Sequence, residues 1–179
     1  SAAHNAQSCI FWHTDSAIIL IFHVMDHIKD RADGKTCKSL CKKGKAHHVV
    51  LLAKNQEGLR NIYELVSESQ LKYMVRTPRI PKSLLTSKRE GLIIGSACEA
   101  GELYRAILDG EDRNRQLEIA SFYDYLEIQP NGNNMFLVRD GKLKDVSDIE
   151  NINRSIIALA DSLGKPVVAT GDVHFIDES

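Results

Sequence analysis

Residues 48–69 read HVVLLAKNQEGLRNIYELVSES, and this stretch decides the fold class. Its first part, residues 49–53, is a short continuous apolar run, as expected of a strand buried on both faces. Asn55 follows as a candidate N-cap, and apolar residues then recur at helical spacing between Leu59 and Val66. The stretch therefore predicts one strand followed by one helix.

The same alternation continues towards the C-terminus. Further strands are predicted at residues 92–97, at residues 123–129 and at residues 167–170. An alternation of strands and helices is typical of parallel α/β architecture. Four βα units are too few to close an eight-stranded barrel of about 250 residues. We therefore expect an open sheet or part of a barrel.

Local signals mark the predicted helices between these strands. One helix is expected over residues 99–109, ended by Gly110. Another is expected to begin at a capping box of Ser147 and Glu150 and to end at Gly164. Pro78 and Pro81 surround a predicted turn, and Pro81 suits the first turn of a short helix.

The first 45 residues differ from the rest. Residues 16–28 (SAIILIFHVMDHI) predict a short helix with apolar groups on nearly every side. Residues 29–45 are small, basic and aperiodic, which predicts a linker or mobile loop. We therefore expect a boundary between residues 1–45 and residues 46–179.

Composition excludes several classes of protein. The chain has 179 residues, of which 43% are hydrophobic and 26% charged, values ordinary for a globular domain and unlike a disordered or collagen-like chain. Its net charge of −1 hides an asymmetry, since the first 98 residues sum to +7 and the last 81 to −8. A self-contained small enzyme rarely needs such a division.

Cysteine content and hydropathy favour an intracellular protein that does not enter a membrane. Four cysteines and no recognisable signal peptide do not suggest a secreted disulfide framework. The apolar run at residues 17–25 is about half the ~20 residues that a membrane-spanning helix needs.

Candidate metal ligands follow two of the predicted strands, at the ends where parallel α/β folds place their chemistry. Cys98 follows the second strand, and the fourth continues into Asp172 and His174. Residues two apart in an extended chain point the same way, so these last two can share one ion. His48 begins the first strand, the opposite end by the same rule. Imidazole, carboxylate and thiolate together suit zinc or another first-row metal.

Each of these residues also has a purely structural interpretation. Asp172 can cap or brace the chain, Cys98 can be a small buried residue, and His48 can face solvent or core. Cys37 and Cys41, followed by paired histidines, resemble a zinc knuckle only superficially, because the spacing fits no standard finger.

Other charged groups also allow more than one interpretation. A basic stretch can contact phosphates or form a solvated loop; it comprises Arg76, Arg79, Lys82, Lys88 and Arg89. Glu99 and Glu102 lie one helical turn apart, where a charged surface face is the simpler interpretation. No Gly-rich phosphate loop and no G-x-S-x-G or H-E-x-x-H motif is present.

Five longer motifs carry a family resemblance. In order they are HHVVLLAKNQEGLRNIYELVSESQLKY, RTPRIPKSLL, REGLIIGSACEAGELYRAIL, EIASFYDYLEIQP and KPVVATGDVHF, within residues 47–177. Together they resemble PolC-type DNA polymerase III alpha subunits, in the C-terminal part of the polymerase-and-histidinol-phosphatase (PHP) domain. The resemblance implies a partial (β/α)7 barrel and a zinc or manganese site. The ligands that it implies are His48, Cys98, Asp172 and His174.

The sequence also departs from that family. The family's PHP domain opens with a His-x-His pair that is followed by an Asp-His and a Glu, and no such ordered set occurs in these 179 residues. The family inserts a proofreading exonuclease just before the matching region, so residues 1–45 are expected to be a remnant of its last helix plus a connector. The exonuclease motif would need an Asp five residues after His4, where Cys9 stands. No exonuclease residues are therefore assigned.

The resemblance implies a role in DNA replication. We expect a piece of a longer cytoplasmic polymerase that adds nucleotides to a DNA primer and contacts DNA, other replisome subunits and the rest of its own chain, but no membrane. With an incomplete ligand set, the segment alone is expected to hold no catalytic residue, and both retention and loss of its metal stay open. Its unpaired edge strands predict poor stability as an isolated monomer. The alternatives are a non-catalytic docking module of the replicase and a PHP-type metal-dependent phosphoesterase.

Overall fold

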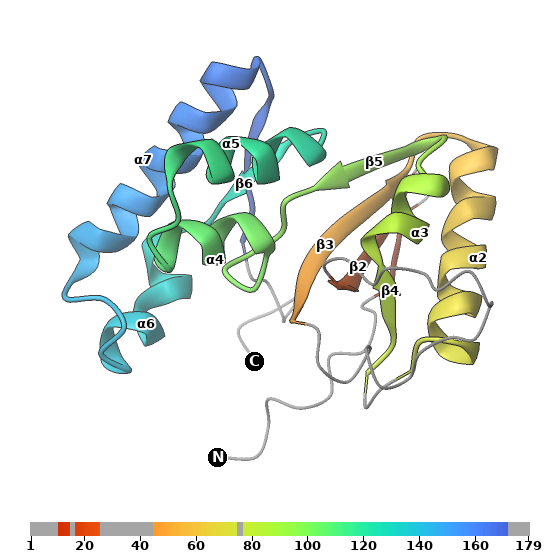
Figure 1. The fold of residues 1–179 in the computed structure, drawn as a ribbon, viewed down its shortest axis with the longest axis horizontal. Coiled ribbons are helices and arrows are strands. Elements are labelled where there is room, and N and C mark those ends of the chain that lie inside the picture. The colour runs from red at the N-terminus through yellow and green to blue at the C-terminus, as the bar shows by residue number, and fades with distance from the viewer. Residues whose placement is uncertain (1–10, 15–16, 26–44, 75–76, 172–179) are drawn as a thin grey trace. The chain divides into compact units, whose positions relative to one another are not determined.

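A computed structural model describes residues 11–14, 17–25, 45–74 and 77–171 (Figure 1). The chain divides into two compact units, residues 1–94 and residues 95–179.

The first unit is built on a sheet whose strands, as far as the described residues go, follow the order β1-β2-β3-β5. The strands are β1 (Phe11–Thr14), β2 (Ala17–Met25), β3 (Ala46–Ala53), β4 (Arg79–Pro81) and β5 (Leu92–Gly95). β2 is antiparallel to β1 and to β3 but parallel to β4. β1 and β4 pair with successive segments of β2, because Thr14 lies opposite Ala17 and Arg79 lies opposite His23. The sheet is therefore mixed, because β1 and β2, which lie outside the predicted alternation of strands and helices, add antiparallel pairs to it.

The helix predicted at residues 16–28 is also wrong, because residues 17–25 form strand β2. A run that is apolar on every side fits a helix or a strand that is covered on both faces, and periodicity cannot separate the two. The pairing of β2 with β3 over seven residues decides the question, from Ile19 opposite Leu52 to Met25 opposite Ala46. Phe22 and Met25 are completely buried in the result.

The strand and helix predicted from residues 48–69 are confirmed. The centre of β3 is buried, and helix α2 (Gln56–Leu71) follows it. Asn55 is its N-cap, and the side chain accepts a hydrogen bond from Gly58 N at 2.9 Å. α2 packs against β3 and β4. Residues without solvent exposure form this core, among them Leu51, Ile62, Leu65, Ile80 and Leu85.

The proline segment forms more structure than a turn. β4 ends at Pro81, which is the N-cap of the short helix α3 (Lys82–Ser87). Pro81 lacks the N–H that a further ladder bond would need, so the strand ends there and the helix begins.

Two glycines lock the start of α2 against the turn before β5. A Cβ on Gly58 would lie 1.8 Å from the carbonyl oxygen of Gly91. That same oxygen accepts from Lys54 N at 2.8 Å, and Asn61 Nδ2 donates to Glu90 O at 2.9 Å. Gly91 itself has φ +71°, a conformation that favours glycine.

The second unit places helices beside a short parallel pair of strands, β6 (Leu126–Ile128) and β7 (Val167–Ala169). The helices are α4 (Glu102–Leu108), α5 (Arg113–Phe122), the 3-10 helix η1 (Asn131–Asn134), α6 (Met135–Arg139) and α7 (Val146–Leu163). α7 packs against β6, α4 and α5. α5, η1 and α6 were not predicted. α5 lacks a strong apolar stripe and has only Ile119 and Ala120 buried, so helical spacing gives little sign of it.

α7 ends where predicted but begins at a different cap. Gly164 has φ 62° and ends the helix. The capping box of Ser147 and Glu150 is wrong, because the N-cap is Asp145, whose side chain accepts from Ser147 N at 2.7 Å. The Ser147 hydroxyl donates to that carboxylate at 2.5 Å. Among the described residues, no helix is long and apolar enough to cross a membrane.

Replacing Gly58 with alanine tests the packing of the first unit. We expect Gly58→Ala to lower the free energy of unfolding by about 1–3 kcal/mol, because the added methyl group displaces backbone. The matched control is Gly132→Ala, where a Cβ meets nothing within 4 Å. Chemical denaturation followed by circular dichroism measures both variants, and equal stability of the two would contradict the close contact.

Replacing Asp145 tests the corrected cap. Asp145→Ala should lower the melting temperature by roughly 2–4 °C and Asp145→Asn by much less, because asparagine caps nearly as well. Hydrogen bonds from the Ser147 hydroxyl and the Ser147 backbone N–H lower the pKa of Asp145 below its ordinary 3.8. Its charge therefore contributes stability above about pH 3.8, and this contribution is lost as pH falls through the lowered pKa. Thermal melts at pH 7 and pH 3 check this, and a larger loss in Ser147→Ala than in Asp145→Ala would restore the capping box.

Candidate metal centre

The loop that carries Cys98 connects β5 to α4 and is tightly built. Ala97, just before the cysteine, has φ 59°, and it is the only non-glycine residue with positive φ in the described part of the chain. This conformation costs an alanine roughly 1–2 kcal/mol. Gly101 N donates to Cys98 O at 2.8 Å, and a Cβ on Gly101 would lie 2.2 Å from Ser96 O. Strain of this kind is concentrated at functional sites, so the loop is a candidate.

Burial keeps the thiol of Cys98 neutral. Desolvation, followed by the neighbouring negative charge of Glu99, raises the pKa of Cys98 to about 12. A neutral thiol is a poor ligand and nucleophile, whereas a bound cation stabilises the thiolate. Cys98 can therefore act as a ligand only when a cation supplies that stabilisation.

Glu127 lies in the same unit as Cys98 and was not among the predicted site residues. It is 6% exposed on β6, between Leu126 and Ile128. Thr170 Oγ1 donates to its Oε2 at 3.1 Å, and its backbone N donates to Ser96 Oγ at 2.9 Å. The only sequence signal is an acidic residue within an apolar strand.

The other carboxylate oxygen of Glu127 makes no hydrogen bond of normal geometry in the described structure. This Oε1 faces Gly95 beside the Tyr125 hydroxyl, since a Cβ on Gly95 would lie 2.7 Å from the first and 2.4 Å from the second. Burial raises the pKa of Glu127, while the hydroxyls of Thr170 and Tyr125 and the backbone N–H of Ala97 oppose the shift. A buried carboxylate held by hydroxyl and amide donors marks this strand end as a polar site.

The structure describes two of the four predicted ligands. Asp172 and His174 lie outside the described residues, although Thr170 ends two positions before Asp172. Within the described ranges, no three His, Cys, Asp or Glu side chains gather as a metal site. His48 belongs to the first unit and Cys98 to the second, so the described residues bring no two predicted ligands together within one unit.

His48 contacts a second imidazole within its own unit. It lies opposite His23 in the register of β2 and β3, and the ring centroids are 4.8 Å apart with an interplanar angle of 86°. The two imidazoles therefore form an edge-to-face aromatic contact. Burial, with further contributions from His48 and Arg79, lowers the pKa of His23 to about 4. His23 is therefore neutral at pH 7.

The sequence of this chain is similar to that of a known protein family. The family model described as "PHP domain" matches residues 12–131, more than half of the chain. The chain belongs to the PHP family. The match begins in β1 and runs through residue 45, where the sequence predicted a boundary.

The relatives with the same PHP region are described as "DNA polymerase III PolC-type". The protein of Clostridium perfringens (strain 13 / Type A) is 57% identical over 136 residues, which is 76% of this chain and 9% of that protein. The protein of Caldanaerobacter subterraneus subsp. tengcongensis is 54% identical over 129 residues, 72% of this chain and 9% of that protein. The protein of Staphylococcus aureus is 41% identical over 137 residues, 76% of this chain and 10% of that protein. The chain thus spans about a tenth of the length of the curated relatives that it matches.

Other charged residues of the PHP chain serve its packing. Glu102 is buried at 6% exposure, so the surface face expected for Glu99 and Glu102 is wrong for Glu102. Its Oε2 accepts from the Tyr123 hydroxyl at 3.3 Å, and its Oε1 lies 3.6 Å from Arg115 Nη2. In the basic stretch, Lys88 pairs with Glu64 of α2. Cys37, Cys41 and Arg76 lie outside the described residues.

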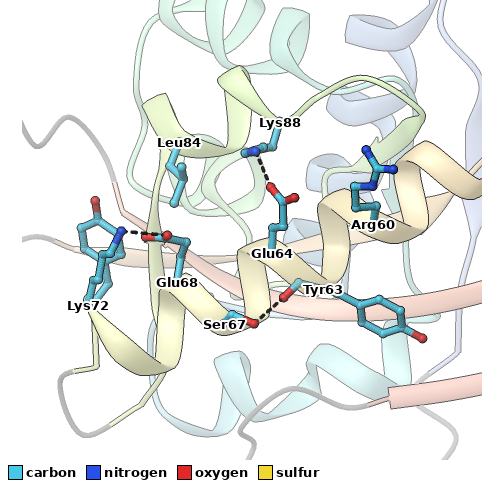
Figure 2. A pocket seen from close by; sticks show the side chains of 9 residues that line it. Arg60, Tyr63, Glu64, Ser67, Glu68, Lys72, Leu84 and Lys88 are labelled. Atoms are coloured by element: carbon cyan, nitrogen blue, oxygen red, sulfur yellow. Dashed lines mark hydrogen bonds and ion pairs between the residues drawn. The ribbon is translucent and has the colours of Figure 1, made fainter.

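A groove of about 510 Å³ runs along α2 and α3 of the first unit. Figure 2 shows that both carboxylates of the groove are paired with lysines, Glu68 with Lys72 at 2.8 Å and Glu64 with Lys88. The pairing with Lys88 lowers the pKa of Glu64. Because both carboxylates of the groove are ion-paired, the Cys98 loop is the stronger candidate.

Replacing Gly95 tests the close approach at the end of β5. A Cβ there would lie 2.3 Å from the ring of Tyr125. We expect Gly95→Ala to lower the free energy of unfolding by about 1–3 kcal/mol, since the ring and the Glu127 carboxylate must both move. In a Tyr125→Ala background the same substitution should cost clearly less. Denaturation of the four proteins in this double-mutant cycle measures the coupling, and additive losses would contradict the contact.

Proposed function

We propose that this chain is part of the PHP domain of a PolC-type DNA polymerase III alpha subunit, a DNA-directed DNA polymerase that replicates DNA. The observation that carries the proposal is the 57% identity over 136 residues with the polymerase of Clostridium perfringens. The PHP match over residues 12–131 supports the same assignment. Nucleotide transfer belongs to the parent protein, and the segment alone is not a catalyst in this proposal.

Within that domain, the segment contributes part of a (β/α)7 barrel and part of its metal centre. The parallel pairing of β6 with β7, and the parallel bridge between Gly95 and Tyr125, support a barrel-like arrangement of the second unit. The proposed ligands are His48, Cys98, Asp172 and His174, for zinc or manganese. When bound, such an ion would polarise phosphate oxygens and activate water. The chain's own residues would orient the thiol and exclude solvent from it.

The proposed partners follow from the parent activity. They are DNA, other replisome subunits and the remainder of the polymerase chain, in the cytoplasm where bacterial replication takes place. The derivation of residues 1–45 from an exonuclease helix and connector stays a prediction.

A second candidate is a PHP-type metal-dependent phosphoesterase. The strained Ala97 beside Cys98 and the buried carboxylate of Glu127 favour it, because both features concentrate at catalytic sites.

A chimera tests the first proposal. The 136-residue segment that matches this chain replaces its counterpart in the Clostridium perfringens protein, and primer extension is measured. We expect the chimera to keep primer extension, and the same chimera with Gly58→Ala to lose soluble yield because its PHP segment is destabilised. A folded chimera without primer extension would overturn the proposal.

A hydrolysis assay on the 179-residue chain distinguishes the two candidate functions. We expect no hydrolysis of p-nitrophenyl phosphate in the presence of Mn²⁺ or Zn²⁺. Hydrolysis that disappears in Cys98→Ala would support the phosphoesterase and contradict an inactive segment.

A further inference from the structure

Glu127 links segments that are distant in the sequence, through its backbone and through its carboxylate. Its strand pairs with β7, its backbone N donates to Ser96 Oγ at 2.9 Å, and its Oε2 accepts from Thr170 Oγ1 at 3.1 Å. Ser96 stands two residues before Cys98, and Thr170 stands two residues before Asp172. Glu127 therefore contacts the chain directly upstream of two proposed ligands.

A carboxylate is a costly choice at this position. The side chain is 94% buried, and a buried charge or acid is stable only when it is well hydrogen-bonded. A valine or isoleucine would suit the strand better by propensity and burial. The polar contacts that Glu127 makes are therefore the reason to look for a role beyond packing.

The Cys98 loop needs an external support of this kind. Ala97 is held at φ 59°, which the residue does not adopt by preference. The backbone N–H of Ala97 interacts with the Glu127 carboxylate, and the neighbouring Ser96 hydroxyl accepts from the Glu127 backbone. Glu127 thus contacts the residue directly before the strained Ala97.

We propose that Glu127 is a positioning residue for the metal centre, holding the Cys98 loop and Thr170 at one fixed separation. The inference rests on the proposed metal site. Residues that orient ligands without binding the ion commonly change metal affinity 10–100-fold when removed. Glu127 is assigned that role, and no direct bond to the ion.

The experiment measures Co²⁺ binding to the full 179-residue chain, with cobalt as a spectroscopic substitute for zinc or manganese. The thiolate-to-cobalt absorption band reports on Cys98 itself, and titration gives the dissociation constant. We expect Glu127→Leu to weaken binding at least about tenfold and to reduce this band. Glu127→Gln keeps an acceptor for Thr170 and should recover most of the affinity.

A milder variant keeps the test valid where Glu127→Leu folds poorly. Thr170→Val removes only the hydroxyl that donates to Glu127, and we expect it to weaken binding severalfold. The double variant should bind no more weakly than Glu127→Leu, because both substitutions remove the same link.

Tyr123→Phe is the matched control. It removes a buried hydrogen bond to another carboxylate of the same unit, that of Glu102. It should lower thermal stability while leaving the cobalt affinity and the absorption band unchanged.

The outcomes distinguish failure of the proposed metal site from failure of the positioning role of Glu127. If the unsubstituted chain binds Co²⁺ without a thiolate band, or does not bind it, the proposed metal site fails and the role of Glu127 fails with it. If the unsubstituted chain binds with the band but Glu127→Leu and Thr170→Val bind equally well, only the positioning role is overturned. Loss of affinity in Tyr123→Phe as large as in Thr170→Val would also overturn it, because general destabilisation would then explain the effect.

Discussion

The backbone of Gly58 lies against the carbonyl of Gly91 so closely that no side chain fits between them. This contact fixes where α2 begins relative to the turn that leads into β5. The N-cap Asn55 satisfies the first turn of the helix at the same place, and Lys54 N shares the Gly91 oxygen. The position of the turn that leads into β5 depends on this one close approach.

The second unit contains two buried glutamates that are stabilised in different ways. Glu102 lies beside a guanidinium and a tyrosine hydroxyl, so its charge is compensated within the helical layer. Glu127 has no cation beside it among its described contacts, and hydroxyl and amide groups hold it instead. A carboxylate compensated only by dipoles is less completely balanced than an ion pair. That difference marks the strand ends around Glu127 as the polar centre of the unit.

Sequence patterns identified the elements whose signals are local. β3, α2 and the end of α7 at Gly164 each carry their cause within a few residues: a continuous apolar run, an Asn cap and a left-handed glycine. β2 was mistaken for a helix because its identity depends on pairing with β3, more than twenty positions later in the chain. Glu127 escaped notice for the same reason, since its partners lie 31 and 43 positions away. His48 and Cys98 stay predicted ligands, and the contact of His48 with His23 was not predicted because it depends on the register between β2 and β3.

Lys165 links the start of β7 to the end of α5 through its side chain. Its ammonium group donates to the carbonyls of Ala120 at 3.1 Å and Ser121 at 2.7 Å, and also to that of Tyr123. These carbonyls are the ones that a helix C-terminus leaves without intrahelical partners. Acetylation of this lysine would remove the charge and two of its three donors, so the last turn of α5 would fray. The amide hydrogens of that turn would then exchange with solvent faster, although the modified residue is more than forty positions further along the chain.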